Sequence, residues 1–124
     1  MKRVLMIGAA ALLTAATPLP RLTQIPGGLW EVSGVSGAAP VRQCMAVRTV
    51  TQFEHRGEAC PRAVISQNGD TTIFQYNCPS GGFGRSEVTV ITPRSLRIDT
   101  QGISGGLPFH YVLQARRIGE CASR

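Results

Sequence analysis

Short stretches in which apolar and polar residues alternate recur along most of the chain, separated by clusters of Gly, Pro, Asn and Ser. In the first stretch, 29–35, Trp30 and Val32 fall on one face and polar residues on the other. Alternation with a period of two is typical of a half-buried β-strand. One segment, 46–53, instead repeats its apolar residues at helical spacing and predicts a short helix. Further strands are predicted over 41–45, 62–67, 71–78, 85–91, 95–101 and 109–116.

A tight turn is predicted where the dipeptide Asn68-Gly69 separates two of these strands. This dipeptide is the strongest short signal for a hairpin, because a type I′ turn needs positive φ at both central residues. A two-residue loop at this point places Val64 opposite Ile73 further along the two strands.

A second hairpin is predicted around a three-residue loop at 92–94. This loop places Val90 opposite Leu96 and Val88 opposite Ile98, so that the apolar residues share one face. The residues between them are polar and fall on the other face, as a half-buried antiparallel pair requires.

Together the strands predict a mainly β fold in a single domain. Seven short strands in meander order make one antiparallel sheet, which is strongly bent or closes into a partial barrel. The chain adds one short helix, and the glycine-rich segments 80–84 and 102–108 are expected to be loops. A chain of this length buries enough apolar surface for one core.

The N-terminal residues have the layout of a secretory signal peptide. A cationic start precedes an apolar run over 4–13 and a small-residue exit at Ala16. The run is shorter than the roughly twenty apolar residues that cross a membrane, and no Cys follows it to carry a lipid anchor. We therefore expect a cleaved signal over 1–16 and a periplasmic or secreted domain over 17–124 with no membrane span.

Four cysteines remain in that domain, at Cys44, Cys60, Cys78 and Cys121. An even number in an exported chain predicts two disulfides, and their wide spacing lacks the Cys-x-x-Cys pattern of metal sites. Four cysteines allow three connectivities. The register of the first hairpin sets Cys60 opposite Asn77, which turns Cys60 and Cys78 to opposite faces. We therefore favour Cys44–Cys60 and Cys78–Cys121, while the other pairings stay open.

The charge of the chain narrows the range of partners. The formal net charge is +6, and with Lys2 and Arg3 removed, eleven Arg minus seven Asp and Glu leaves +4. Nucleic-acid binding calls for a denser basic stripe with exposed aromatic residues, so no nucleic acid is expected as a partner. A moderate positive charge still attracts anionic lipid headgroups or polysaccharides at long range.

Three motifs that resemble functional sites lack the context that such sites need. The segment 102–106 reads Gly-x-Ser-x-Gly, but a nucleophile elbow requires a helix after a buried strand. The segment 81–85 is glycine-rich but lacks the Lys-Ser/Thr of a phosphate loop. Asp99 and His110 are expected to pair across strands with no nucleophile beside them, and His55 is expected at the surface. No catalytic, cofactor-binding or metal-ligating residue is therefore predicted, and an enzyme is not expected.

Four sequence features occur together: Pro-Gly-Gly-Leu-Trp-Glu over 26–31, Arg-Gln-Cys over 42–44, the later Cys60 and Cys78, and Ala-Arg-Arg-Ile-Gly-Glu-Cys over 115–121. Their combination resembles a family of small exported bacterial proteins that is catalogued only as a domain of unknown function. The resemblance implies a signal peptide, a β-rich domain and paired cysteines. It implies no activity and no functional residue.

Two hypotheses on function follow from the predicted sheet. Its aromatic residues form either a filled core or, where the sheet closes incompletely, a pocket for a small apolar or amphipathic envelope ligand. The alternative is a protein–protein interaction or inhibitor module that acts through the loops 80–84 and 102–108. Both hypotheses are non-enzymatic, and neither calls for a cofactor. The aromatic residues concerned are Trp30, Phe74, Tyr76, Phe109 and Tyr111.

Overall fold

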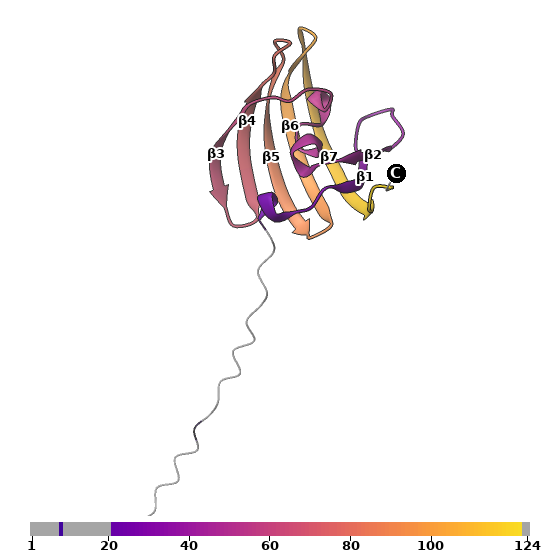
Figure 1. The fold of residues 1–124 in the computed structure, drawn as a ribbon. Helices are drawn as coiled ribbons and strands as arrows, with labels where there is room; N and C mark the ends of the chain where they lie inside the picture. The colour runs from indigo at the N-terminus through magenta and orange to yellow at the C-terminus, as the bar shows by residue number, and fades with distance from the viewer. Residues whose placement is uncertain (1–7, 9–20, 123–124) are drawn as a thin grey trace, which may run out of the picture.

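The fold is that of a computed structural model, which describes Gly8 and residues 21–122 (Figure 1). The predicted signal peptide, 1–16, lies outside the described residues except for Gly8. Seven strands form one antiparallel sheet that does not close, which confirms the predicted fold class. The strands are β1 (Gly28–Ser33), β2 (Val41–Met45), β3 (Arg62–Asn68), β4 (Thr71–Asn77), β5 (Phe83–Thr92), β6 (Ser95–Ser104) and β7 (Leu107–Gly119).

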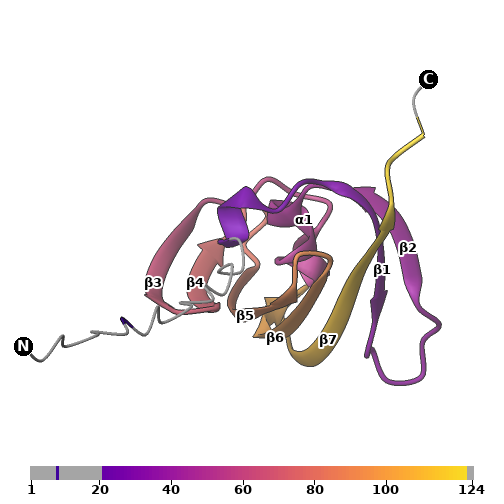
Figure 2. The same cartoon turned by 90° about the horizontal axis from the view of Figure 1, so that it is seen from below.

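The order of strands in the sheet is β2-β1-β7-β6-β5-β4-β3. The predicted meander therefore holds from β3 to β7, whereas the β1–β2 hairpin joins the sheet beside β7. The link from β2 to β3 must then cross from one edge of the sheet to the other. Figure 2 shows the strands arranged in an arc, with this crossing link and its helix α1 on the inner side.

The crossing link contains α1 (Val47–Val50) and the 3-10 helix η2 (Phe53–His55), and a further 3-10 helix, η1 (Leu22–Gln24), precedes β1. The predicted helix over 46–53 is thus one α-helical turn followed by a tighter turn, because β-branched residues disfavour a longer helix. Val47, Val50 and Phe53 are buried, so the predicted apolar stripe is present.

The core lies between the inner face of the curved sheet and the α1–η2 link. Ser86 Oγ donates a hydrogen bond to the carbonyl oxygen of Thr51 (2.8 Å) and lies 2.9 Å from Thr100 Oγ1, so buried polar groups also tie the link to the sheet. Burial of each large apolar side chain stabilises the fold by about 1.5–3 kcal/mol. The buried core residues include Trp30, Val32, Val50, Phe53, Phe74, Tyr76, Val88, Val90, Leu96, Ile98, Leu113 and Ala115.

The register predicted for the hairpin of β5 and β6 is confirmed. Val90 pairs with Leu96 and Val88 with Ile98, and all four side chains are buried. The strands continue one residue further into the turn than expected, since Thr92 pairs with Ser95 after a local bulge.

The predicted register of the β3–β4 hairpin is wrong. Its two central turn residues are Gly69 and Asp70, and Asn68 pairs with Thr71 inside the ladder. Only Gly69 has a positive φ (60°), which is the pattern of a type II′ turn and not of type I′. Val64 consequently lies opposite Phe74.

A bulge between Val64 and Ser66 shifts the β3–β4 register once more. Beyond it, Arg62 pairs with Tyr76, so that two residues further out Cys60 comes opposite Cys78. These two cysteines form a disulfide with their Cα atoms 4.4 Å apart.

The second disulfide joins Cys44 to Cys121, with Cα atoms 5.7 Å apart. Two disulfides are confirmed, but the favoured pairings Cys44–Cys60 and Cys78–Cys121 are wrong. The error is the one-residue register shift, which had set Cys60 opposite Asn77.

The segment 102–108, predicted to be a loop, is mostly strand. β6 continues to Ser104 and β7 begins at Leu107, so only Gly105 and Gly106 form the turn. Both have positive φ (58° and 79°), as a type I′ turn requires. The cluster of glycines had concealed the strand, because Gly102 serves a close approach of two strands and not a turn.

Candidate functional site

A hollow of about 610 Å³ lies over β4, β5 and β6, mainly on the outer face of the sheet, and reaches Phe109 of β7. Five of its lining residues have a buried neighbour along their strands and therefore face outward, and Ile103 shares their face because it pairs with Phe83. We call it the outer hollow. The outward-facing residues are Gln75, Asn77, Phe83, Arg85, Gln101 and Ile103.

The outer hollow has an apolar row and a polar row. Phe83 pairs with Ile103, and the Phe83 side chain is 48% exposed. Two residues along the strands, Arg85 pairs with both Gln75 and Gln101. Because neighbouring strands lie about 5 Å apart, each row presents adjacent side chains to one ligand.

Two opposed glycines, Gly84 and Gly102, line the hollow between these rows. A Cβ atom on Gly102 would collide with the backbone of Phe83 and Gly84, and one on Gly84 would collide with the ring of Tyr76. The absence of side chains therefore lets β5 and β6 approach closely, while the Tyr76 ring covers Gly84 from the inner face.

The five aromatic residues predicted to face a ligand do not form one site. Trp30, Phe74 and Tyr76 are at most 1% exposed and belong to the core. Phe109 and Tyr111 are half-buried and stack with ring centroids 5.6 Å apart. Of the five, Tyr76 and Phe109 line the outer hollow.

Sequence reasoning missed Phe83 and the polar row around Arg85. The sequence pattern assigns Arg85 to the start of a strand, and it assigns Phe83 to a glycine-rich loop. A pairing of the 83–85 segment with 101–103 would have placed them together, but it requires 102–104 to be strand.

A second hollow, of about 580 Å³, lies at the end of the sheet between η2 and two turns. The turns are 80–82 and 103–106, so the structure brings both predicted glycine-rich segments to one place. The Glu58 carboxylate accepts hydrogen bonds from the backbone N–H (3.1 Å) and Oγ (2.7 Å) of Ser80 and thereby holds the first turn. We call this hollow the end cleft.

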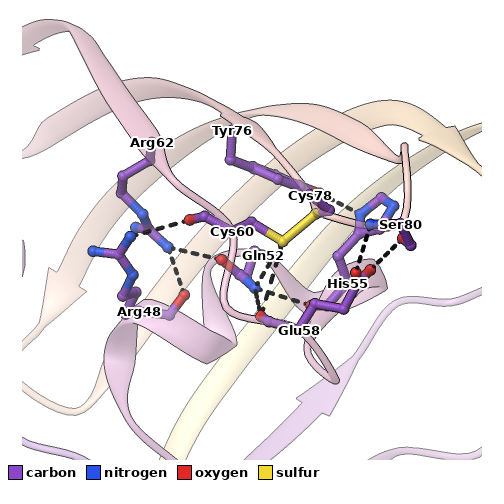
Figure 3. Close-up of a disulfide and its surroundings, with 9 residues drawn as sticks. All are labelled: Arg48, Gln52, His55, Glu58, Cys60, Arg62, Tyr76, Cys78 and Ser80. Atoms are coloured by element: carbon purple, nitrogen blue, oxygen red, sulfur yellow. Dashed lines mark hydrogen bonds between the residues drawn. A yellow bond between two sulfur atoms is a disulfide. The ribbon is translucent and has the colours of Figure 1, made fainter.

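His55 lines the end cleft but is only 6% exposed, so its predicted surface position is wrong. Its Nδ1 atom lies 2.9 Å from the Tyr76 hydroxyl, and Figure 3 shows the two side chains in contact. Its Nε2 atom is buried and has no hydrogen-bond partner within residues 21–122. Burial raises the pKa of Tyr76 to about 12, and the charge of Glu54 acts in the same direction. A Cβ atom on Gly82 would collide with the imidazole, so this glycine makes room for His55.

Arg48 of α1 and Arg62 of β3 lie side by side next to the Cys60–Cys78 disulfide (Figure 3). Arg62 donates to the carbonyl oxygen of Arg48 (2.7 Å) and its guanidinium stacks on the Phe74 ring at 4.1 Å. Burial, together with the positive charge of Arg48, lowers the pKa of Arg62 to about 10. The two ion pairs within the described residues involve neither arginine.

His110 and Asp99 are in contact, with Nε2 2.8 Å from Oδ1, on the exposed outer face. The expected register placed Asp99 directly opposite His110. Asp99 instead pairs with Val112, two residues further along β7, so its contact with His110 is diagonal. A shift of two residues keeps each side chain on its face, which is why the contact still forms. Within residues 21–122, the one hydroxyl hydrogen-bonded to a histidine is that of Tyr76.

Glu58, Cys60 and Cys78 have potential metal-binding atoms within 4.8 Å of one another. The two cysteines are joined in a disulfide and offer no thiolate, and the carboxylate is hydrogen-bonded to Ser80. These three residues therefore stabilise the fold and do not offer the donor atoms of a metal site.

Comparison with known proteins gives a family but no activity. The family model described as "Protein of unknown function (DUF3617)" matches residues 21–121. The chain belongs to this family. The resemblance seen in the sequence motifs is thereby confirmed, whereas no curated protein and no solved structure matches the chain.

One further feature bears on where this DUF3617 domain resides. Its two disulfides are compatible with an oxidising compartment outside the cytoplasm. None of the helices within the described residues has the length and apolar character needed to span a bilayer.

Proposed function

We propose that this DUF3617 domain is a non-enzymatic, exported binding module that holds a small amphipathic ligand in the outer hollow. The observation that carries the proposal is the division of the hollow into an apolar row, Phe83 with Ile103, and a polar row around Arg85. A concave site with apolar walls and a few convergent polar groups is the usual form of a small-molecule site.

The polar row suits a ligand whose polar end is rich in hydroxyl groups. Gln75 and Gln101 each carry one hydrogen-bond acceptor and two donors, whereas Arg85 only donates. Hydroxyl groups both donate and accept, so they satisfy such a mixed row better than a bare anion or an ammonium group does. The apolar end of the same ligand would pack on Phe83 and Ile103.

The non-enzymatic character of the proposed module is supported by the surroundings of its histidines. His110 lies exposed beside Asp99, and His55 is buried against Tyr76. Within residues 21–122, the one hydroxyl within hydrogen-bond reach of a histidine is that of Tyr76, which is 1% exposed, so neither histidine lies beside an accessible nucleophile that it could activate. Ser104 of the Gly-x-Ser-x-Gly segment ends strand β6 beside a type I′ turn and does not stand on a strand-to-helix elbow.

Binding of octyl glucoside tests the proposed ligand class. This probe combines a hydroxyl-rich head with an apolar chain and is titrated below its micelle-forming concentration, with calorimetric detection. Phe83→Ala is expected to weaken binding at least tenfold, about 1.4 kcal/mol, because the apolar row loses its largest side chain. Arg85→Gln is expected to weaken it less.

The matched control for that test is Val64→Ala, an apolar truncation at a 62% exposed position of the edge strand β3. Its binding should equal that of the unmodified protein. Equal affinity of the Phe83→Ala protein and the Val64→Ala protein, or no binding at all, would rule out the outer hollow as the site.

A second candidate function is a protein–protein interaction through the end cleft. The observation in its favour is the convergence of turns 80–82 and 103–106 on one hollow. Gly57 lines the same cleft, has open space at its Cβ position and has no positive φ, so Gly57→Trp should fill the cleft without disturbing the core. A set of periplasmic proteins recovered with this variant that is identical to the set recovered with the unmodified protein would end this hypothesis.

A further inference from the structure

A third hollow, of about 330 Å³, lies where η1 passes over α1 and the start of β3. Two of its lining residues are Arg48 and Arg62, whose guanidinium groups have no carboxylate partner within the described residues. We call it the arginine hollow. It shares no lining residue with the outer hollow.

The two arginines keep hydrogen-bond donors unused. A guanidinium group has five N–H donors, and Arg48 uses one of them, toward the carbonyl oxygen of Cys60 (3.0 Å). Arg62 is held more firmly, by Thr51 Oγ1 (3.1 Å), Gln52 Oε1 (3.3 Å) and the carbonyl oxygen of Arg48. Its Nε atom is buried and has no hydrogen-bond partner among the described residues. A fixed cation beside an exposed one with free donors is the arrangement that receives a carboxylate or phosphate group.

The remaining walls of the arginine hollow are largely apolar. Leu22 and Ile25 come from the N-terminal segment and Val47 from α1, and each is at most 9% exposed. An inorganic anion would use the charges and leave the small apolar surface that these walls still expose in contact with water. An anion that carries an alkyl chain would use both, because burial of apolar surface adds to the charge attraction.

We propose that the arginine hollow binds the carboxylate or phosphate head of a single-chain anionic amphiphile, with its alkyl chain against Leu22, Ile25 and Val47. The site is separate from the outer hollow. It binds a ligand with an anionic head, whereas the outer hollow suits a ligand with an uncharged, hydroxyl-rich head. Binding relieves the repulsion between two adjacent cations that the fold itself leaves uncompensated.

Four probes separate the two contributions to binding, with residue-resolved amide chemical shifts of the purified protein as the readout. Octanoate and octyl phosphate carry both the anion and the chain, inorganic phosphate carries only the anion, and octyl glucoside carries only the chain. Octanoate and octyl phosphate are expected to shift amides around Arg48 and Ile25. Both should bind at least tenfold more tightly than inorganic phosphate does. Octyl glucoside is expected to leave these amides unmoved. Affinity for octanoate should fall as salt is raised, since the charges are partly exposed.

Arg48→Gln is expected to weaken octanoate binding at least tenfold. Arg97→Gln is the matched control, because it removes the same charge from the exposed outer face of β6 and should leave binding unchanged. Arg48→Lys keeps the charge but loses the planar fork, and its affinity should lie between those of the Gln variant and the unmodified protein.

Any of three results with these probes and variants would overturn the proposal. They are equal octanoate affinity in the Arg48→Gln and Arg97→Gln proteins, octyl glucoside binding in the arginine hollow as tightly as octanoate, and inorganic phosphate binding as tightly as octyl phosphate. Absence of binding by all probes would also overturn it. Should Arg48→Gln fail to fold, the probe series and the salt dependence in the unmodified protein still decide the question.

Discussion

Two glycines without unusual backbone angles set the shape of the sheet at the outer hollow. Gly84 and Gly102 face each other on β5 and β6, and neither has a positive φ. They are required because of what surrounds them, since a Cβ at either position would meet backbone or a buried ring. Sequence alone marks such a residue only as a glycine, and we took Gly102 for part of a loop.

Gly102→Ala should lower the free energy of unfolding by about 1–3 kcal/mol, because the added methyl group forces two backbones apart. Gly57→Ala is the control, since Gly57 has open space at its Cβ position and no positive φ. That substitution should be neutral or stabilise slightly by restricting the unfolded chain. Urea unfolding of the two variants measures the difference, and equal stabilities would contradict the close approach.

The hydroxyl of Tyr76 is the buried partner of His55 Nδ1. Tyr76→Phe should therefore cost about 1–3 kcal/mol near neutral pH, because it leaves a buried polar atom unpaired. The folded pKa of Tyr76, about 12, lies above the ordinary value of about 10. The unfolded chain thus loses this proton first as the pH rises, and the stabilisation that Tyr76 gives is complete below about pH 10 and is lost above it.

Unfolding free energies of the unmodified and Tyr76→Phe proteins should consequently converge by ~1.4 kcal/mol per pH unit above about pH 10. The lowered pKa of Arg62 acts in the opposite direction, but it largely cancels from the difference, because burial and Arg48 shift this pKa more than Tyr76 does and are common to both proteins. A difference that stays constant from neutral pH to about pH 12 would show that Tyr76 titrates like an exposed tyrosine.

At the scale of elements, the disulfides follow from the registers of the hairpins. The strand pattern predicted the β5–β6 pairing correctly because apolar residues on both strands mark the same face. In the β3–β4 pair, apolar residues do not mark one face of both strands, because β3 is an edge strand whose residues from Ala63 to Asn68 are all exposed. A bulge in β3 costs little free energy and leaves no mark in the sequence. It shifts the register by one residue, and this shift changes which cysteines lie opposite each other.

Burial predicts which disulfide is reduced first. Cys44 and Cys121 are both exposed, whereas Cys60 and Cys78 are 0% and 8% exposed. Limited treatment with a water-soluble reductant should open Cys44–Cys121 while Cys60–Cys78 stays intact, as seen by alkylation and peptide mapping. The exposed bridge closes 77 residues and the buried one 18, which correspond to about 4.5 and 3 kcal/mol by chain entropy. Mapping that joins Cys44 to Cys60 would contradict the structure.

At the scale of the whole molecule, an open curved sheet is filled from its inner side by the chain's own link between β2 and β3. This arrangement places Trp30, Phe74 and Tyr76 in a packed core, and any ligand is left with the outer face, the end and the arginine hollow. The sequence predicted the sheet, the short helix and the number of disulfides. It did not reveal the hollows, because each depends on residues that only the curvature and long-range pairing bring together.

Export concerns the whole chain and is a prediction that rests on the layout of the first sixteen residues; the two disulfides are compatible with it. The small-residue exit at Ala16 predicts a mature protein that begins at Thr17. The intact mass of the protein recovered from the periplasm of a bacterial host should match residues 17–124 with two disulfides. Recovery of the uncut chain from the cytoplasm with four free thiols would contradict export.

The central claim is that the outer hollow binds an amphipathic ligand, and its location is tested most directly by mapping amide chemical shifts during titration with octyl glucoside. The account predicts that the largest saturable shifts cluster at Phe83, Arg85, Gln101 and Ile103, and that they disappear in the Phe83→Ala protein. Shifts that cluster instead at the end cleft, around Gly81 and Gly105, or no saturable shifts at all, would contradict it.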